Sequence, residues 1–343
     1  MKDYWRPLTQ FSHSSHTDEF LALTGRDEVL FGAVERIRRD EGGSIVEGPL
    51  GLDAARRAGF STDVEERLCA RRPVMAGFDF LRPLIMGILN VTPDSFYDGG
   101  RYDEVDVAIE QGLQMLDEGA DIIDLGGEST RPGARLISEA EELSRVLPVI
   151  KGLREESDVV ISIDTRKASV MAAAVGAGAS LINDVSALEF DPKARAVAAD
   201  VNVPVVLMHA QGTPDVMQAA PTYNNVLLDV YDGLEEKIEL ALDAGIEAHN
   251  LIIDPGIGFG KTLAHNMALM QGLSLFHGLG VPLLLGCSRK RFIAEISRDA
   301  PVEARLPGSL AGVMLGAMQG VQIMRVHDVA ETRQALDVFY GTL

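Results

Sequence analysis

Polar and charged side chains follow eight short apolar segments of the sequence, and their types are those that bind ligands and transfer protons. The residues at these endings are Asn90, Asp124, Asp164, Asn183 with Asp184, His209, Asp254, Lys290, and Arg325 with His327. Each alone has a simpler explanation, because Asp and Asn often cap helices or form turns, and a His or a Ser-Arg-Lys run is often structural or solvated. Eight such endings together are not expected of a fold built for stability only. We therefore interpret them as parts of one site.

Three of these residues suit a flat heterocycle. Asp164 and Asp254 offer carboxylate acceptors, and Asn183 offers an amide that both donates and accepts hydrogen bonds. A ring that carries amino, ring N–H and carbonyl groups would pair with this set, whereas an analogue without those groups would leave buried polar atoms unpaired. The residue types therefore predict a binding site for a polar, planar ligand.

Strands that alternate with helices must position these residues. The eight apolar segments are predicted strands at 85–91, 122–125, 159–164, 181–185, 204–209, 251–254, 282–286 and 322–327. Helix-length amphipathic segments cover 105–118, 139–155, 167–177, 228–244, 264–277, 309–319 and 330–339. Strands that are apolar throughout indicate a parallel sheet covered on both faces, and eight of them in about 260 residues favour a closed (β/α)8 barrel, with its active site at the carboxyl ends of the strands. An open doubly wound sheet is the alternative, and the absence of a GxGxxG turn after the first strand argues against it.

The last strand ends provide cations. Lys290, Arg325 and His327 lie where barrels often bind phosphate. Asn90 and acidic residues of the rim could complete a Mg²⁺ shell, because Mg²⁺ prefers oxygen ligands and usually keeps waters and substrate phosphates. Two segments, 92–104 and 127–138, contain glycines that would permit closure over a ligand. We therefore expect a phosphorylated ligand.

Residues 1–82 do not follow this alternation, and we expect them to form a small α+β extension packed on the barrel of residues 83–343. Within the extension we predict strands at 20–24 and 29–37, helical turns at 53–58 and 62–69, a loop at 42–51, and a hairpin near 74–81 that closes the barrel bottom. A partly disordered tail is the alternative, but Trp5 and the apolar clusters favour docking. No residue of the extension suggests chemistry.

The charge of the chain excludes several kinds of partner. The 343 residues contain 31 Lys and Arg and 51 Asp and Glu, a formal net charge of −20. Such a chain repels nucleic acid and anionic membranes, so a few local cations or a metal must hold any anionic ligand. No apolar run approaches the ~20 residues of a spanning helix, the N-terminus lacks the apolar core of a signal peptide, and Cys69 and Cys287 have no zinc-like or disulfide spacing. We expect a cytoplasmic protein that acts on small molecules, with neither nucleic acid nor membrane as a partner.

Motifs at the strand ends resemble those of the dihydropteroate synthase family of pterin-binding enzymes. They are MGILNVTPDSFYDGG at 86–100, DLGGESTRPG at 124–133, SIDT at 162–165, IND at 182–184, LMH at 207–209, DPGIGFGK at 254–261, SRK at 288–290 and RVHD at 325–328. They occur in the family's order between residues 84 and 340, and the first two are long and specific. The resemblance implies an α/β fold, a (β/α)8 TIM barrel, to which this chain adds its N-terminal α+β extension.

The resemblance also implies an activity. Members of the family condense 6-hydroxymethyl-7,8-dihydropterin diphosphate with 4-aminobenzoate, giving 7,8-dihydropteroate and pyrophosphate, a folate-pathway step that sulfonamides inhibit. The enzyme is thus expected to be a transferase of an alkyl (pterinylmethyl) group. Mg²⁺ is the expected cofactor, the two small molecules are the expected substrates, and a homodimer is the expected assembly.

Individual residues receive roles from the resemblance. The residues expected to be catalytic are Asp164, Lys290, Arg325 and His327, and Asn90 is the expected Mg²⁺ ligand. The residues expected to bind substrate are Thr130, Asp164, Asn183, Asp254, Lys290, Arg325, Val326, His327, Met208, Phe259, Phe96, Pro132 and Arg291. Among them, the pterin is expected at Asp164, Asn183, Asp254 and Lys290, and the diphosphate at Asn90, Thr130, Arg325 and His327. Phe96, Pro132 and the start of the helix after Lys290 are expected to border the aminobenzoate.

One position departs from the commonest family pattern, and two other functions are alternatives. Arg291 stands where many members carry Ser beside the aminobenzoate carboxylate, although an Arg could pair with that carboxylate bidentately. A methyltetrahydrofolate-binding barrel of the corrinoid methyltransferases would not need cations for a diphosphate at Lys290 and Arg325. A non-catalytic pterin-binding homologue would lack at least one of Asn90, Asp164, Lys290 or Arg325, and all four are present.

Overall fold

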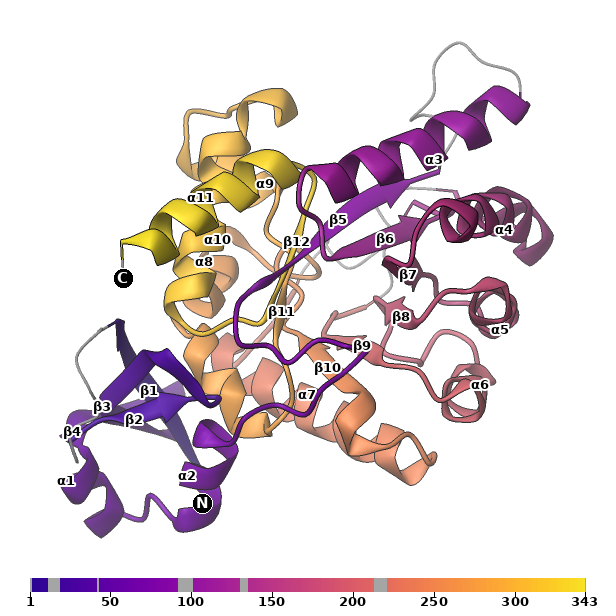
Figure 1. Cartoon of the computed structure of the whole chain (residues 1–343). Helices are drawn as coiled ribbons and strands as arrows, with labels where there is room; N and C mark the ends of the chain where they lie inside the picture. The colour runs from indigo at the N-terminus through magenta and orange to yellow at the C-terminus, as the bar shows by residue number, and fades with distance from the viewer. Residues whose placement is uncertain are drawn as a thin grey trace.

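The computed structural model describes residues 2–11, 19–41, 43–91, 101–129, 135–212 and 221–342, with the backbone alone for residues 101–103. Eight parallel strands follow one another around a barrel (Figure 1). They are β5 (Leu84–Asn90), β6 (Ile122–Gly126), β7 (Val160–Asp164), β8 (Leu181–Asp184), β9 (Val205–Met208), β10 (Leu251–Asp254), β11 (Leu284–Leu285) and β12 (Ile323–Val326). A parallel bridge between Ile253 and Leu283 joins the two outer strands, β10 and β11. The predicted (β/α)8 barrel is thus confirmed, and the open sheet does not form.

Helices surround the strands, as Figure 1 shows. Those in the described ranges are α3 (Arg101–Asp117), α4 (Glu139–Glu156), α5 (Ala168–Ala177), α6 (Ala194–Val201), α7 (Val226–Asp243), α8 (Leu263–Gln271), α9 (Arg291–Ile296), α10 (Leu306–Met318) and α11 (Val329–Gly341). Short 3-10 helices lie at η2 (Ala248–Asn250), η3 (Leu273–Leu279) and η4 (Val302–Ala304). The strands are buried on both faces, which explains why their sequences are apolar throughout. None of the helices in these ranges is long and apolar enough to cross a membrane.

Two features of the helices differ from the sequence prediction. The segment predicted as one helix at 264–277 is divided at Gly272 into α8 and η3. A Cβ on Gly272 would lie 2.7 Å from Leu227 Cδ1, so the glycine allows α7 to pack closely against this break. The other feature is α6, which was not predicted because a helix of eight residues is too short to display a periodic pattern. The helix that the resemblance implies after Lys290 forms as α9.

The bottom of the barrel is closed by the chain that leads into β5. Met75 and Phe78 exchange backbone hydrogen bonds of 2.9 and 2.8 Å and form an antiparallel bridge, which is a short form of the hairpin predicted near 74–81. Met75 and Phe80 are 4% exposed and pack against the lower side chains of the strands. This segment therefore fills the end of the barrel opposite to the polar strand ends.

The N-terminal segment forms a four-stranded antiparallel sheet with two helices. Its elements are β1 (Asp3–Phe11), β2 (Leu21–Leu23), β3 (Arg26–Asp40), β4 (Gly43–Gly51), α1 (Leu52–Arg57) and α2 (Thr62–Cys69). The long strand β3 pairs with β1 along one edge and with β2 and β4 along the other. The prediction of a loop at 42–51 is wrong, since residues 43–51 form β4. Glycine and proline suggest a loop there, but β3 supplies a hydrogen-bonding partner that the local sequence does not reveal.

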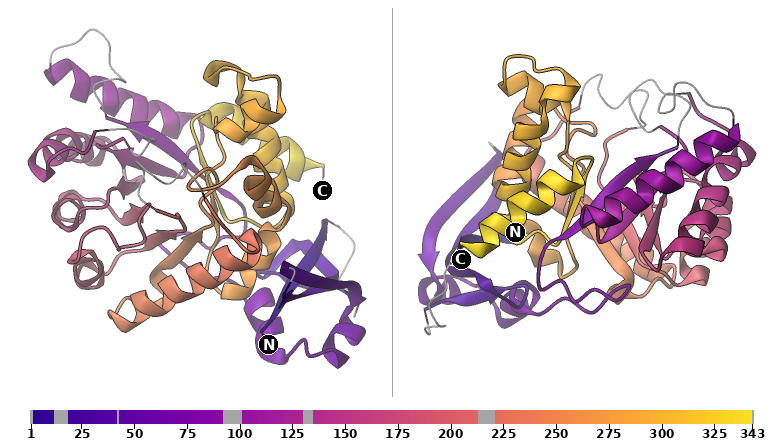
Figure 2. Two further views of the ribbon diagram at one scale, coloured as in Figure 1. Left: turned by 180° about the vertical axis from the view of Figure 1, so that it is seen from behind. Right: turned by 45° about the horizontal axis from the view of Figure 1, so that its top comes forward.

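The extension has a core of its own and docks on the barrel through buried polar contacts. Trp5, Phe31 and Leu68 belong to that core. Arg26 is only 1% exposed and donates to the Tyr340 hydroxyl (2.5 Å) and to the Val321 carbonyl (3.5 Å). The extension lies against the side of the barrel that carries the C-terminal elements (Figures 1 and 2). The contacts of Arg26 therefore hold the extension against α11 and against the backbone just before β12.

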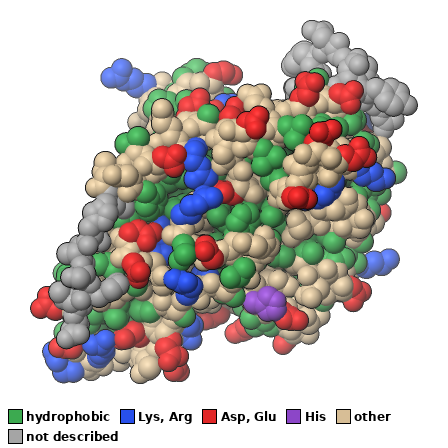
Figure 3. All heavy atoms as spheres, viewed as in Figure 1, with side chains coloured by type: hydrophobic (Ala, Val, Ile, Leu, Met, Phe, Trp, Pro, Cys, Tyr) green, Lys and Arg blue, Asp and Glu red, His purple; other side chains and the backbone are tan. Residues whose placement is uncertain are grey.

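The charge of the chain is spread over the surface. On the face drawn in Figure 3, acidic side chains occur over all parts of the molecule, and basic side chains lie among them in small groups. The net charge of −20 thus does not arise from a single acidic tail.

Candidate active site

The barrel interior is apolar at its bottom, and on five of the eight strands the inward residue two positions further along is polar. The lower layer consists of inward side chains from all eight strands: Leu84, Met86, Ile122, Val160, Leu181, Val206, Ile252, Leu284 and Ile323. Successive residues of a strand face opposite sides, so the residues two positions on also face inward. They are Ile88, Asp124, Ser162, Asn183, Met208, Asp254, Gly286 and Arg325. The polar groups are therefore gathered towards the carboxyl ends of the strands.

The strand register aligns Asn90 with Asp164. Asn90 lies opposite Gly126, Gly126 opposite Asp164, and Asp164 opposite Asn183 on four neighbouring strands. A Cβ on Gly126 would lie 3.4 Å from Asn90 Oδ1 and 3.8 Å from Asp164 Oδ2. The glycine thus leaves open the space that both side chains border.

Arg325 crosses the barrel interior and binds two buried carboxylates. Its Nε donates to Asp124 Oδ2 at 2.6 Å, and its Nη2 donates to Asp164 Oδ2 at 2.8 Å. Asp124 also accepts from Ser162 Oγ at 2.6 Å and from Asn183 Nδ2 at 3.0 Å. Asp124 is predicted from the sequence as a strand ending only, without a role in the site. Its position two residues before Gly126 was the available signal, since it places Asp124 on the inward face.

Burial and charge shift the pKa of Asp164. Burial raises it to about 7; Arg325 opposes this rise, while the nearby carboxylates of Asp124, Asp184 and Glu142 add to it. For Arg325 burial acts against the charge, but Asp124 and Asp164 outweigh it and raise the pKa of the guanidinium. Asp164 Oδ1 is buried and has no hydrogen-bond partner in the described part of the chain. This oxygen is therefore available to a ligand.

A second pair of charges, Asp254 and Lys290, lies on the other side of the interior. A Cβ on Gly286 would lie 3.8 Å from Lys290 Nζ and 3.9 Å from both Asp254 Oδ2 and Arg325 Cβ, so the three side chains surround this glycine. Asp254 Oδ1 accepts the Gly256 N–H at 2.7 Å. Lys290 donates to the Ile257 carbonyl and places its ammonium 4.6 Å from the centre of the Phe259 ring.

The pKa values of this pair are also shifted by burial. Burial lowers the pKa of Lys290 to about 8; Asp254 opposes this change, and Arg325 adds to it. Burial likewise raises the pKa of Asp254, against the attraction of Lys290. A proton can therefore be exchanged within this interior near neutral pH, which is the range where acid–base chemistry operates.

Three residues that were predicted to bind substrate at or after the last strands lie in different surroundings. His327 Nδ1 lies 3.0 Å from Ser288 Oγ, on the same face of the strand end as Arg325. Val326 packs instead in the apolar core between the barrel and its helices, because neighbouring residues of a strand face opposite sides. Arg291 is 88% exposed along its side chain and pairs with Glu295 at 2.8 Å. Val326 and Arg291 are thus not brought to the interior group. Phe96, Thr130 and Pro132 lie outside the described residues.

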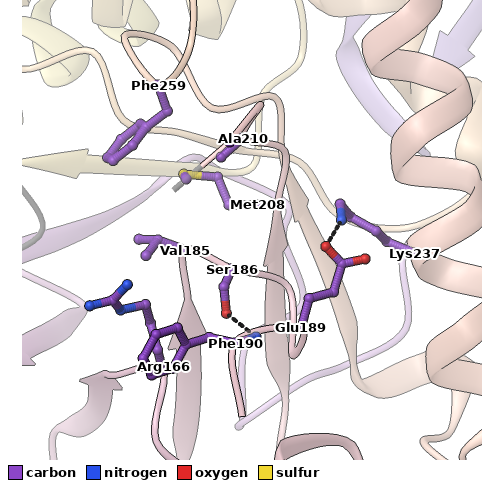
Figure 4. A pocket seen from close by; sticks show the side chains of 10 residues that line it. Arg166, Val185, Ser186, Glu189, Phe190, Met208, Ala210, Lys237 and Phe259 are labelled. Atoms are coloured by element: carbon purple, nitrogen blue, oxygen red, sulfur yellow. Dashed lines mark hydrogen bonds and ion pairs between the residues drawn. The ribbon is translucent and has the colours of Figure 1, made fainter. Parts of the chain in front are cut away.

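Met208 and Phe259 line a cavity of about 270 Å³ (Figure 4). In Figure 4 Val185 lies beside them, and Arg166 and Phe190 form the opposite end, with the guanidinium carbon 4.2 Å from the ring centre. None of these last three residues was predicted from the sequence. Arg166 and Val185 follow the ends of β7 and β8 closely, which was the signal for placing these two residues at the rim.

A metal ion bound by the described residues would have few protein ligands. They contain no group of three or more His, Cys, Asp or Glu side chains that could bind a metal ion. Asn90 offers one amide oxygen on the open space beside Gly126. This donor fits Mg²⁺, which commonly takes one or two protein oxygens and completes its shell with water and phosphate.

The chain is similar to known proteins over most of its length. The model of a family described as pterin binding enzyme matches residues 86–327. The chain is 52% identical over 250 residues to the dihydropteroate synthase of Bacillus subtilis, covering 73% of this chain and 85% of that protein. Among solved structures it is similar to the Xanthomonas albilineans enzyme with 4-aminobenzoic acid (48% identity, TM-score 0.74, covering 79% and 97% of the two chains). It is also similar to the enzyme from that organism in complex with 7,8-dihydropteroate (45% identity, TM-score 0.71, covering 77% and 95%).

Proposed function

The chain belongs to the dihydropteroate synthases of the pterin-binding enzyme family, and we propose that its barrel rim transfers a pterinylmethyl group to 4-aminobenzoate. The donor is 6-hydroxymethyl-7,8-dihydropterin diphosphate. The bond between the methylene carbon and the diphosphate oxygen breaks, a bond from that carbon to the arylamine nitrogen forms, and the amine loses a proton. The products are 7,8-dihydropteroate and pyrophosphate, so the enzyme is an alkyl-group transferase of folate synthesis.

The observation that carries this proposal is the arrangement of charges around Arg325. Asp164 and Asp254 both border the interior from different strands, and Arg325 and Lys290 lie between them. A pterin can place its amino, ring N–H and carbonyl groups against Asp164, Asn183 and Asp254, with its ring against Met208 and Phe259. The unpartnered Asp164 Oδ1 then receives a ring donor, so that binding removes a buried unpaired acceptor.

The diphosphate is held by the cations at the last strands. Arg325 and His327 face the same side of the end of β12, and Lys290 precedes α9 nearby. Thr130 is a further proposed contact, carried by the resemblance of its motif. Because the whole chain carries a net charge of −20, binding of this anion depends on these few local cations rather than on the overall field.

Mg²⁺ is proposed as the cofactor, with Asn90 as its protein ligand. When bound, it would stabilise negative charge on the departing pyrophosphate. Asn90 lies in the row of Asp164, so a metal there would be close to the proposed diphosphate site. The neutral amide adds no charge of its own, and the phosphate oxygens would supply the remaining anionic ligands.

The residues of the chain then act on the reacting carbon by electrostatics and by exclusion of water. Asp164 in its ionised form favours positive charge that develops on the dihydropterin as the C–O bond breaks. Arg325 and His327 favour the negative charge that leaves with the pyrophosphate. The arylamine is a weak base, so the site must keep water away from the methylene carbon until the amine attacks. Phe96, Pro132 and Arg291 are the proposed neighbours of the aminobenzoate.

Pyrophosphate release tests the proposal directly. The purified chain is mixed with the pterin diphosphate, 4-aminobenzoate and Mg²⁺, and the expected result is pyrophosphate and dihydropteroate in equal amounts. Omission of 4-aminobenzoate should abolish dihydropteroate formation. Binding of the pterin without any release above background would contradict the proposed activity and favour a non-catalytic homologue.

A cytoplasmic homodimer is the proposed state of the enzyme. Both cysteines are free thiols, as suits a reducing compartment. Residues 306–319, which include α10, contain no charged side chain, and Pro307, Ala311 and Met318 of one helix face are exposed. An uncharged apolar face is where two chains of net charge −20 could meet with least repulsion. Light scattering that finds one chain per particle would contradict the dimer.

A further inference from the structure

Four charged side chains are buried beside the candidate site and have no part in the proposed reaction. They are Glu128, Glu142, Arg166 and Lys167, which are 6%, 0%, 8% and 5% exposed. Two acids balance two bases, as expected where charges leave water, because an unpaired buried charge is costly. The four side chains come from the end of β6, from α4 and from the end of β7.

Glu128 makes a contact in this group that Glu142 does not make. Its Oε1 accepts the backbone N–H of Ile137 at 3.0 Å, while its Oε2 accepts from Arg166 Nη2 at 3.0 Å and lies 3.3 Å from Lys167 Nζ. Glu142 accepts from Lys167 with one oxygen, and its other oxygen has no hydrogen-bond partner in the described ranges. Only Glu128 therefore joins the charged group to a backbone N–H of another segment.

The positions of these contacts give Glu128 a particular role. Glu128 comes two residues after the last residue of β6, and Ile137 comes two residues before the start of α4. The carboxylate thus joins the two ends of the segment 129–136. Arg166 and Lys167 come directly after Asp164 and Thr165, so the same carboxylate also ties this segment to the end of β7.

The ionisation of Glu128 agrees with its geometry. Burial acts to raise the pKa of this carboxyl, but the Ile137 N–H, Arg166 and Lys167 outweigh burial and hold the pKa below its ordinary value. Glu128 is therefore charged at every pH at which the enzyme would work, and a charged acceptor holds a backbone N–H more strongly than a neutral one.

We propose that Glu128 is a positioning residue for the 4-aminobenzoate half of the reaction. It fixes both ends of the segment 129–136 against the end of β7 and touches no substrate itself. This inference rests on the proposed function, in which Thr130 and Pro132 of that segment contact the diphosphate and the aminobenzoate. The pterin, by contrast, is held by strand residues that Glu128 does not contact.

Two matched variants separate this role from a general contribution to stability. Glu128→Met and Glu142→Met each remove one buried carboxylate from Lys167, with the same change in charge and size. Glu128→Met alone removes the acceptor of the Ile137 N–H, and it also removes the ion-pair partner of Arg166. Both variants are compared at pH 8, where Asp164, with its pKa of about 7, is ionised in either protein.

The first readout does not depend on activity. The Arg135 side chain is 81% exposed, so trypsin can reach the bond after it once the local backbone opens. Loss of a hydrogen bond to a charged acceptor should speed this cleavage by roughly tenfold or more in Glu128→Met. Glu142→Met should be cut at the rate of the parent. Mass spectrometry of the fragment 136–343 identifies the bond.

The second readout is kinetic. In Glu128→Met we expect the KM for 4-aminobenzoate to rise by roughly tenfold. The calorimetric Kd of a pterin without the diphosphate should stay within about twofold, because the ring is held by residues that Glu128 does not contact. Glu142→Met should change neither quantity. A residue that only stabilises the fold would lower the fraction of active protein but leave both constants unaltered.

The outcomes distinguish the inference from the proposed function. Equal cleavage rates for the two variants, or a loss of pterin affinity as large as the rise in KM, would overturn the positioning role. If the parent chain had no synthase activity, the cleavage comparison would still decide whether Glu128 anchors the segment. Should Glu128→Met not fold, hydrogen exchange of the parent decides: the Ile137 amide should exchange much more slowly than that of Arg135, and equal rates would refute the anchor.

Discussion

Arg325 and Asp124 form an ion pair of 2.6 Å across the barrel interior, although 201 positions separate them in the sequence. Asp124 is fully buried and does not meet the proposed substrate with a free oxygen, since its two oxygens accept from Arg325, Ser162 and Asn183. It therefore orients the guanidinium that reaches Asp164 and the amide of Asn183. The carboxylate to which no role was given from the sequence is the one that organises the site.

The pair leads to a prediction about Arg325. Arg325→Met should lower the free energy of unfolding by ~3–5 kcal/mol, because it leaves two buried carboxylates without their cation. It should also abolish binding of the pterin diphosphate. Urea denaturation and calorimetry measure the two effects. Arg333→Met is the control, since Arg333 pairs with Asp121 at the opposite end of the barrel at 2.8 Å and should cost far less.

Asp164 is predicted to be needed for turnover rather than for folding. Asp164→Asn keeps the shape of the side chain but removes the negative charge that would favour a cationic pterin. The expected loss in kcat is roughly 100-fold or more, the size found when one electrostatic contact to a transition state is removed. Pyrophosphate release gives kcat, and circular dichroism verifies the fold. Turnover near that of the parent would refute the assigned role, and Asp121→Asn should have no such effect.

The activity should depend on pH through Asp164 and Lys290. With pKa values of about 7 and about 8, kcat/KM should rise as pH increases through about 7, where Asp164 ionises, and fall above about 8, where Lys290 loses its proton. The two apparent values belong to the coupled group rather than to isolated side chains. In Asp164→Asn the acidic limb should vanish from the residual activity. An unchanged acidic limb in that variant would assign it to another residue.

The stability of the fold should also respond to the raised pKa of Asp164. The carboxyl titrates near 7 when folded and near ~3.9 when unfolded, so between these values the folded state binds more protons. The stabilisation is therefore present in full below about pH 4 and is lost as pH rises through about 7. Relative to Asp164→Asn, the parent should lose unfolding free energy across this range, and the two curves should run parallel above pH 8. Urea denaturation at several pH values measures the difference. A constant difference from pH 4 to pH 8 would contradict the raised pKa.

The N-terminal extension is predicted to stabilise the barrel without taking part in the reaction. Arg26→Met removes buried donors to Tyr340 and to the Val321 carbonyl, and should lower the free energy of unfolding by ~2–4 kcal/mol. The kcat of the folded protein should stay within about twofold of the parent. Arg57→Met, on the exposed part of α1, is the matched control and should have little effect on stability. Equal stability of the two variants would show that the Arg26 contacts do not hold the extension in place.

Much of the barrel was predictable because its signals are local. Each strand is an apolar run of a few residues, and the polar residue after it marks the rim, so Asp164, Asp254 and Lys290 were identified before any contact was known. Where the signal was not local, the prediction was wrong. Residues 43–51 were predicted to be a loop from their glycines and proline, and they form β4 only because β3 lies alongside.

The sequence by itself therefore determined the strands of the barrel, their order, and the end at which the polar residues gather. The tertiary structure alone decided which of those residues meet. It placed Arg325 between Asp124 and Asp164, turned Val326 into the apolar core, and left Arg291 on the surface with Glu295. The physical reason is that strand formation depends on neighbouring residues in the chain, whereas the pairing of buried charges depends on the register and closure of strands that are far apart in sequence.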